Sequence, residues 1–269
     1  MLLHIAHDTT YRYDAPLRLS TQYLRLSPRP TPGLQVLRWV LELPGPAVQA
    51  LDAWGNTLHV LTLEGDRREI HLRAFGEVQT LDGPQPPEPE DALPAPVFLR
   101  ATPLTTPDAA IQAFAQQHAA SVRAAPEAGL MQLIEALLQR MPYIPGSTDA
   151  ATPAGQAFAT GHGVCQDHAQ VFITCCRLLG LPARYVSGYL ATDAEHVASH
   201  AWAEVRLQSS QGAGWVGFDI SNRCRVDGHH VRLAFGADYA DACPVRGMRS
   251  GGGLEQLATS VQVTAAPDQ

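Results

Sequence analysis

The chain has 269 residues, a formal net charge of -7 and 45% hydrophobic residues. This length suits two unequal domains, and the composition supplies enough apolar side chains for a sizeable core, which excludes disorder as the default state. No basic tail or Lys/Arg-rich run is present, which argues against nucleic acid as a partner.

The opening stretch MLLHIAHDTTYRYD lacks the basic segment, the apolar segment and the small-residue cleavage site of a secretory signal. No apolar run approaches the roughly 18 residues that a membrane-spanning helix needs. The five cysteines are an odd number without regular spacing, which makes a poor disulfide framework. We therefore expect a cytoplasmic protein with no membrane partner.

Strand patterns fill the first part of the chain. Residues 35–43 and 57–63 are strand-like, and residues 69–74 alternate polar and apolar side chains, which is the period of a half-buried strand. Residues 52–56, with the sequence DAWGN, supply a turn between the first two, because glycine and asparagine tolerate positive φ angles. We predict an antiparallel β domain over residues 1–90.

A proline-rich segment from Gly83 to Pro96 interrupts the strand patterns. Proline at this density denies both helical and ladder hydrogen bonds. The segment therefore predicts a semi-rigid, extended linker, which we place at residues 91–97. A second domain is expected over residues 98–269.

Helical patterns begin the second domain. We expect helices at residues 108–120 and 127–141, a short one at 154–159, and another that begins at Cys165. The last of these has apolar residues at helical spacing and ends at Gly180, which is followed by a proline two residues later.

Strand patterns resume after this helix, at residues 183–190, 199–207, 215–220 and 260–264. Helices that precede a run of strands are typical of an α+β protein and not of repeated βαβ units. We therefore expect the helices to pack on a mostly antiparallel sheet.

The stretch GHGVCQDH, residues 161–168, places Cys165 at the start of its helix. Unpaired backbone N–H groups and the helix dipole favour an anion there, and the thiolate is the nucleophilic form of cysteine. The backbone N–H of Cys165 is also free to donate to an oxyanion. Glycines at positions 161 and 163 let a substrate backbone approach closely. The pattern is that of a candidate nucleophile.

A thiolate nucleophile needs an imidazole, and the imidazole needs a carboxylate or amide to orient it. His200 opens the strand pattern HAWAEV, and Asp219 lies in the next one, GWVGFD. Adjacent antiparallel strands would place these two side chains at one end of the sheet. We expect His200 to act as base towards Cys165 and then as acid towards the leaving amine, with Asp219 fixing its tautomer.

Four blocks in this order, GHGVCQD, LPARYVSGYL, HAWAEV and GWVGFD, resemble the core of the transglutaminase-like superfamily, which is papain-like in fold. Residues 234–247 resemble the C-terminal block of that family. The β region around residues 52–56 resembles the N-terminal domain that its bacterial members carry. The resemblance covers nearly the whole chain and implies a transglutaminase-like catalytic domain at residues 98–269.

By position, the resemblance implies Cys165 as nucleophile, His200 as base and Asp219 as the orienting group. It also implies supporting roles for Gln166 and Asp167, beside the cysteine. The family often has Asp-Pro-Thr-Asn where this chain has Asp-Ile-Ser-Asn at residues 219–222. The turn after the aspartate is therefore expected to differ.

Two aromatic residues have two open interpretations each. Tyr143 could line the cleft and donate to the oxyanion, or pack within its loop. Trp202 lies two residues after His200, on the same face of the strand, and could form a wall of the cleft or pack in the core.

Several polar residues have simpler interpretations. Arg184 lies in an apolar strand and needs a partner if it is buried, for which Asp167 is a candidate. His229 and His230 are expected in a loop. The remaining cysteines are expected to be structural.

Cys165 could also be an ordinary buried thiol or a metal ligand, since His162 and His168 each lie three residues from it. A zinc site usually needs four converging ligands, and no second C-x-x-C or H-x-x-H pair is present. No calcium loop of the EF-hand type is present either. We expect neither a metal nor another cofactor.

These observations predict a cysteine enzyme with a Cys-His-Asp triad that transfers an acyl group through a thioester. Hydrolysis of a peptide amide is the expected outcome, with a peptide or protein as substrate, because water is abundant and no motif recruits an amine. One alternative is an amine-transferring transglutaminase. The other is a non-catalytic peptide-binding or scaffold protein that keeps the fold.

Overall fold

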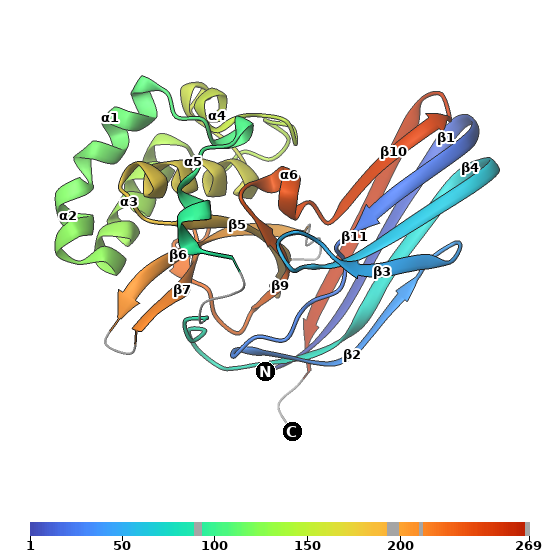
Figure 1. The fold of residues 1–269 in the computed structure, drawn as a ribbon, viewed down its shortest axis with the longest axis horizontal. Coiled ribbons are helices and arrows are strands. Elements are labelled where there is room, and N and C mark those ends of the chain that lie inside the picture. The colour runs from blue at the N-terminus through green and yellow to red at the C-terminus, as the bar shows by residue number, and fades with distance from the viewer. Residues whose placement is uncertain (89–92, 193–198, 210–211, 267–269) are drawn as a thin grey trace.

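The computed structural model describes residues 1–88, 93–192, 199–209 and 212–266. It contains two antiparallel sheets, with helices packed on the second of them (Figure 1). This arrangement confirms the predicted α+β fold, in which an N-terminal antiparallel β region precedes a papain-like, transglutaminase-like core. Among the helices of these residues, none combines the length and apolarity needed to span a bilayer.

The first sheet is built on two long neighbouring strands, β1 (Leu2–Leu24) and β4 (Thr57–Thr80). On the other side of β4 lie β2 (Leu34–Glu42) and β3 (Ala47–Leu51). The two strands predicted at residues 57–63 and 69–74 are therefore parts of one strand. Gly65 adopts a φ of 95° between them, and pairing with β1 continues on both sides of it.

Two C-terminal strands complete the first sheet. β10 (Val245–Gly251) pairs with the second half of β1, and β11 (Glu255–Ala265) pairs with its first half. This differs from the expectation that residues 98–269 form one domain, because β1 offers the edge opposite β4 to strands that are distant in sequence. The predicted limits of the linker at residues 90 and 91 lie outside the described residues.

The second sheet carries five strands in the order β8 (Cys224–Arg225), β7 (Gly212–Asp219), β6 (His200–Ser209), β5 (Ala183–Leu190) and β9 (His230–Gly236). All neighbours are antiparallel. The patterns predicted at residues 183–190, 199–207 and 215–220 correspond to β5, β6 and β7, whereas β9 was not expected from the sequence.

The described residues contain six α-helices, each of which lies in sequence between strands of different sheets. They are α1 (Ala109–Gln117), α2 (Ala119–Ala124), α3 (Pro126–Arg140), α4 (Ala154–Thr160), α5 (Cys165–Leu178) and α6 (Tyr239–Ala242). Two 3-10 helices, Ala95–Leu99 and Pro103–Thr105, precede them. The helix predicted at residues 108–120 is divided at His118, where α1 ends and α2 begins.

Helix α5 lies at the centre of the helical half, between the second sheet and helices α1, α3 and α4 (Figure 1). Every residue from Asp167 to Arg177 is buried. A helix that is covered on all sides is held firmly by packing, so its first residue, Cys165, has a fixed position relative to the sheet.

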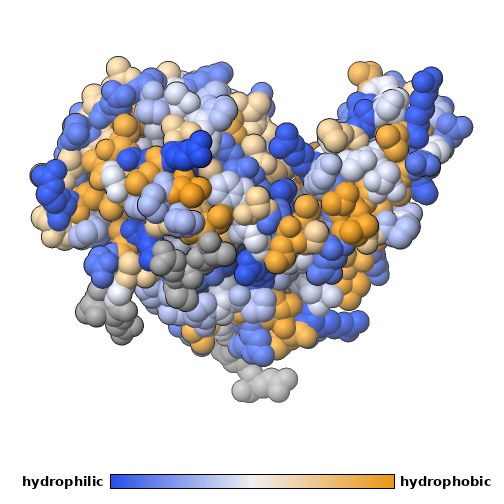
Figure 2. All heavy atoms as spheres, viewed as in Figure 1, coloured by the Kyte–Doolittle hydropathy of each residue, from blue (hydrophilic) through white to orange (hydrophobic). Residues whose placement is uncertain are grey.

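The two sheets share a core. Side chains from the first sheet, such as Leu3 and Ile70, cluster with Tyr189 of β5 and with Val231 and Leu233 of β9. In the space-filling view, a notch separates the helical half from the projecting end of the first sheet (Figure 2). The first sheet is thus anchored at the end of the second sheet and free at its far end.

The predicted turn at residues 52–56 strengthens this contact. Asp52 Oδ1 accepts hydrogen bonds from the backbone N–H groups of Trp54 and Asn56, both at 2.9 Å. The Asn56 side chain in turn donates to the Phe235 carbonyl at 2.7 Å and accepts from the Phe235 N–H at 3.0 Å. The turn therefore ties the first sheet to β9 of the second.

Candidate active site

Cys165 is the half-buried first residue of α5. The loop before it is held by backbone hydrogen bonds, from Ile144 N to Gly163 O at 2.9 Å and from Gly163 N to Pro142 O at 3.3 Å. A Cβ atom on Gly163 would lie 2.7 Å from the Cβ of Asp167. Glycine is therefore required there for the loop to turn closely into the helix.

Asp167 fixes the first turn of α5. Its buried carboxylate accepts hydrogen bonds from the backbone N–H of Val164 at 2.8 Å and from the Thr148 hydroxyl at 2.6 Å, both on Oδ2. A carboxylate near a helix N-terminus also interacts favourably with the helix dipole. Gln166 is half-buried, and its amide lies 3.3 Å from the Ala150 carbonyl. The two predicted supporting residues thus tie the loop at residues 148–150 to the start of α5, and Asp167 also fixes the residue before Cys165.

His200 is the first residue of β6 and lies between the predicted nucleophile and the predicted orienting group. Its Nε2 donates to Asp219 Oδ2 at 2.7 Å. The side chain of Cys165 lies near the imidazole and helps to raise its pKa, and Nδ1 is the ring nitrogen that the bond to Asp219 leaves available. The structure therefore brings Cys165, His200 and Asp219 together in the order that the sequence predicted.

Asp219, the last residue of β7, is fully buried. Besides His200, its Oδ2 accepts from the Asn222 side-chain amide at 2.7 Å, and its Oδ1 lies 3.2 Å from the Asn222 backbone N–H. The residues Ile-Ser that replace the family's Pro-Thr leave the asparagine in contact with the aspartate. The turn at residues 219–222 therefore still orients the carboxylate.

The charges of the three groups reinforce one another. Burial alone would lower the pKa of His200, but the hydrogen bonds and charges of Asp219 and Cys165 outweigh it and raise the pKa to about 10. Burial would raise the pKa of Asp219, but hydrogen bonds from His200 and His230 outweigh it and hold the pKa well below its usual range. An imidazolium at His200 and a carboxylate at Asp219 follow at neutral pH, so a cation lies near Cys165.

His230 is a further residue of the site that the sequence did not indicate. It lies in β9, only 2% exposed, with Nε2 3.0 Å from Asp219 Oδ2 and Nδ1 3.0 Å from Asp227 Oδ1. The expectation of a loop was wrong for His230, because β9 begins with it and pairs it with Leu190 of β5. The apolar run VRLAF that follows it was the available signal for a strand.

Tyr143 is half exposed and forms a β-bridge with Gly163, in the loop before Cys165. Partial burial and the nearby charge of Cys165 raise its pKa. Trp202 is only 1% exposed, and its ring centroid lies 6.2 Å from that of His200. It packs closely against Gly188, so it supports the histidine from the core and does not form a wall of the cleft.

The prediction that Asp167 pairs with Arg184 was wrong. Arg184 is fully buried, and it binds Glu204 through Nε at 2.6 Å and Glu88 through a terminal nitrogen at 2.7 Å. The strand register explains this, because Arg184 of β5 stands directly opposite Glu204 of β6. Opposite charges at paired positions of neighbouring strands attract each other.

The possible metal cluster around Cys165 is not assembled. Both ring nitrogens of His168 have other partners, the Met141 carbonyl at 2.8 Å and the Ser221 hydroxyl at 2.9 Å. Elsewhere in the described residues, His200, Asp219 and His230 bring three possible ligand atoms within 4.8 Å of one another. These atoms already hydrogen-bond to one another. All five cysteines are free thiols.

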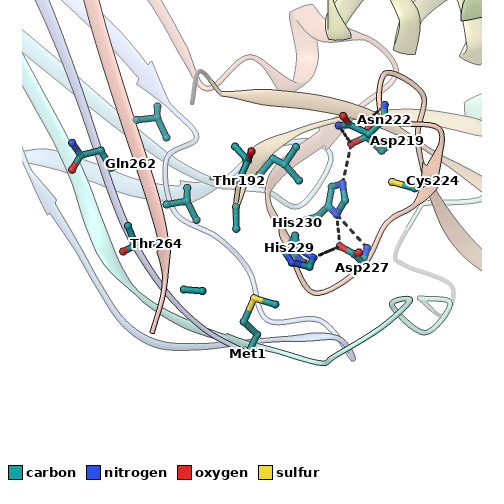
Figure 3. A pocket seen from close by; sticks show the side chains of 15 residues that line it. Met1, Thr192, Asp219, Asn222, Cys224, Asp227, His229, His230, Gln262 and Thr264 are labelled. Carbon is teal, nitrogen blue, oxygen red and sulfur yellow. Dashed lines mark hydrogen bonds and ion pairs between the residues drawn. The ribbon is translucent and has the colours of Figure 1, made fainter. Parts of the chain in front are cut away.

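A cavity of about 820 Å³ adjoins the aspartate side of the site, between β11 and the segment that joins β7 to β9 (Figure 3). Its described lining includes Asp219, Asn222, Asp227 and His230 but neither Cys165 nor His200. Asp227, which bonds to His230, is 32% exposed through its side chain. The buried histidine therefore borders this cavity.

The fold and this arrangement of Cys165, His200 and Asp219 are those of a transglutaminase-like protein. Residues 112–220 match the family model of the transglutaminase-like superfamily, and residues 3–79 match that of the bacterial transglutaminase-like N-terminal region. The chain therefore combines a region similar to the transglutaminase-like core with a region similar to the N-terminal part of bacterial members.

Two relatives and one solved structure are similar to this chain. An uncharacterized protein of Mycobacterium leprae is 27% identical over 286 residues, which cover 97% of this chain and 98% of the relative. One of Mycobacterium tuberculosis is 38% identical over 136 residues, or 46% of this chain and 43% of the relative. The crystal structure of a "putative cysteine protease" from Cytophaga hutchinsonii superposes with a TM-score of 0.71 and 20% identity, covering 100% of this chain and 92% of that one. This last likeness shows a shared fold.

Proposed function

We propose that the protein is a cysteine amide hydrolase that cleaves a peptide or protein amide through a thioester on Cys165. The observation that carries the proposal is the position of His200. One side of its ring donates to Asp219 at 2.7 Å, and the side chain of Cys165 is near enough to help raise the pKa of the ring. A nucleophile, a base and an orienting carboxylate in this sequence of contacts are what covalent acyl transfer requires.

In the first half of the reaction, the thiolate of Cys165 attacks the amide carbonyl carbon and a C–S bond forms. The first N–H groups of a helix have no partner within the helix, so the backbone N–H of Cys165 is suited to donate to the resulting oxyanion. The His200 imidazolium then gives its proton to the departing amine as the C–N bond breaks. A thioester and a neutral imidazole remain.

In the second half, neutral His200 takes a proton from water, and the hydroxide equivalent attacks the thioester carbonyl. The C–S bond breaks, the thiolate leaves, and the product is a carboxylic acid. The thiolate–imidazolium pair is thereby restored. Asp219 stays ionised throughout, because it receives hydrogen bonds in both states of His200 and lies in a buried site that favours the charged form.

The first test measures the reactivity of Cys165 without knowledge of the substrate. We expect iodoacetamide to alkylate Cys165 rapidly well below pH 7, since thiols paired with an imidazole react as thiolates there, whereas unpaired thiols titrate near pH 8.5. The His200→Ala variant should lose this low-pH reactivity. Peptide-mapping mass spectrometry reads both results.

Cys224 provides the control within the same molecule. Burial and the nearby carboxylates of Asp219 and Asp227 raise its pKa to about 12, so it should label slowly at every pH below that. If Cys165 instead labelled as an ordinary thiol, unchanged in His200→Ala, the protein would be a peptide-binding or scaffold member of the family.

A reactive Cys165 then permits a product test with peptide and protein substrates, with and without an added primary amine. A new carboxylate in both conditions supports hydrolysis. A covalent amine adduct that replaces the carboxylate would identify the amine-transferring alternative, which uses the same thioester. Mass spectrometry separates the two products.

A further inference from the structure

His230 is held between two carboxylates. Its Nε2 lies 3.0 Å from Asp219 Oδ2, and its Nδ1 lies 3.0 Å from Asp227 Oδ1 (Figure 3). The ring is 2% exposed, so water does not replace either contact. Two histidines therefore share Asp219 Oδ2, His230 at 3.0 Å and His200 at 2.7 Å.

These two contacts determine the charge of the ring. A neutral imidazole carries one N–H group and can donate to one carboxylate, whereas an imidazolium donates to both. One contact favours the neutral ring, namely the backbone N–H of Asp227, 3.2 Å from Nδ1. The carboxylate of the same residue lies nearer to Nδ1 and carries a full charge, so the imidazolium is the favoured form.

The other charged and titratable groups around His230 come from each neighbouring element. From β6, the ring of His200 lies 6.2 Å away, and the neutral ring of Trp202 lies 5.4 Å away. Cys224 of β8 is close to both aspartates. His229 is bonded to Asp227, and Arg232, two residues along β9, is bonded to Glu88 and Glu204. The two aspartates are thus the anions in contact with the ring.

We propose that His230 is a positioning residue of the catalytic array, a second buried cation that shares Asp219 with His200 and sets the pH range over which Cys165 and His200 exchange protons. This role rests on the function proposed above. His230 binds the same oxygen of Asp219 as His200 does, and its charge offsets part of the negative charge that His200 experiences. The pair is thereby kept from holding its proton too tightly for the second half of the reaction.

The proposal makes a directional prediction, because removal of a positive charge raises the pKa of every group near it. The alkylation rate of Cys165 plotted against pH should show two inflections, one for the thiol of Cys165 and one for the imidazolium of His200. In His230→Gln, which keeps a hydrogen-bond donor but loses the charge, both inflections should move to higher pH. At a separation of about 6 Å and an intermediate dielectric constant, the expected shift is roughly one pH unit.

Two further variants make the test independent of one protein's folding. Asp227→Asn removes the outer anion that holds His230 protonated and should shift both inflections in the same direction by a smaller amount. Asparagine has the same shape as aspartate, and the Asp227 side chain is partly exposed, so the substitution is mild. His229→Gln is the matched control, since His229 is half exposed and bonded to the same Asp227. It should leave both inflections in place.

A slower reaction with unmoved inflections in both His230→Gln and Asp227→Asn would reduce His230 to a packing role and overturn the proposal. The ¹⁵N shifts of His230 at pH 7 provide a separate readout, with both ring nitrogens expected to be protonated. An unreactive Cys165 in the wild-type protein would defeat the proposed function, whereas a neutral His230 ring would defeat only this inference.

Discussion

Two clusters of buried charge lie on the same sheet and differ in the chemistry of their cations. The arginine cluster consists of Arg184, Arg232, Glu88 and Glu204. The histidine cluster consists of His200, Asp219, His230 and Asp227. Strands β6 and β9 each contribute one residue to each cluster. The two clusters therefore share a backbone framework and differ in the chemistry of their side chains.

The guanidinium groups of the arginine cluster stay charged at every physiological pH. Arg184 also lies over the rings of Trp215 and Phe235, 4.3 and 3.8 Å from their centroids, and it binds Glu88 of the proline-rich segment. Imidazoles, by contrast, change charge within the range that chemistry uses. One cluster therefore fastens the proline-rich segment to the sheet, whereas the other consists of groups that can change charge.

The largest expected effect separates these two tasks. Arg184→Met should lower the free energy of unfolding by about 3–5 kcal/mol, because it removes one of the two arginines that neutralise Glu88 and Glu204 and leaves an uncompensated negative charge. Guanidinium chloride denaturation measures the loss. The variant protein that remains folded should still alkylate at Cys165 with the wild-type pH dependence.

An exposed ion pair gives the matched control for this substitution. Arg12 and Glu69 lie 2.9 Å apart with both side chains more than half exposed. Arg12→Met should therefore change the free energy of unfolding by less than about 1 kcal/mol. Equal effects of the two substitutions would contradict the assignment of a fastening role to the arginine cluster.

The second effect is a dependence of stability on pH that differs in sign between the clusters. The pKa of His200 is raised to about 10 in the folded protein, so its contribution is full below about pH 6.5 and is lost as the pH rises towards 10. The pKa of Glu88 is lowered to about 2, since Arg232 and Arg184 outweigh its burial. Its contribution is full above about pH 4.3 and is lost as the pH falls.

Denaturation curves at a series of pH values check this prediction. The alkaline loss of stability should shrink in His200→Gln and persist in Glu88→Gln. The acid loss should shrink in Glu88→Gln, although Asp219, whose pKa is also lowered, maintains part of it. An alkaline loss of the same size in His200→Gln would show that the histidine cluster is not its source.

The smallest effect concerns Asp167, a buried carboxylate that belongs to neither cluster and is held by neutral donors. Thr148→Val removes the hydroxyl that donates to it at 2.6 Å and should cost about 0.5–1.5 kcal/mol of unfolding free energy. Thr160→Val, at an exposed hydroxyl that bonds only a helix carbonyl, is the control. A loss as large as that of Arg184→Met would end the distinction between charged and neutral partners.

The central part of the site could be predicted because each residue lies in its own local block. Cys165 follows a glycine-containing loop and begins a helix, and His200 and Asp219 lie at one end of adjacent strands. The α+β class and strands β5 to β7 also followed from local patterns. These features depend on residues that are close in sequence.

The remaining features depend on pairings between distant segments. His230 reaches Asp219 because β9 joins the sheet beside β5, and Arg184 finds Glu204 through the β5–β6 register. Neither relation leaves a local pattern, so the contact of His230 with Asp219 was not predicted, and Asp167 was named as the partner of Arg184. The same reason explains why the C-terminal strands were assigned to the second domain.

The return of β10 and β11 to the edge of β1 has a consequence for biosynthesis. A ribosome releases β1 and β4 early, whereas the strands that cover the free edge of β1 emerge only after the whole helical half has been made. An uncovered strand edge invites pairing with other chains. The nascent protein must therefore carry an open edge until the helical half and the second sheet have been made.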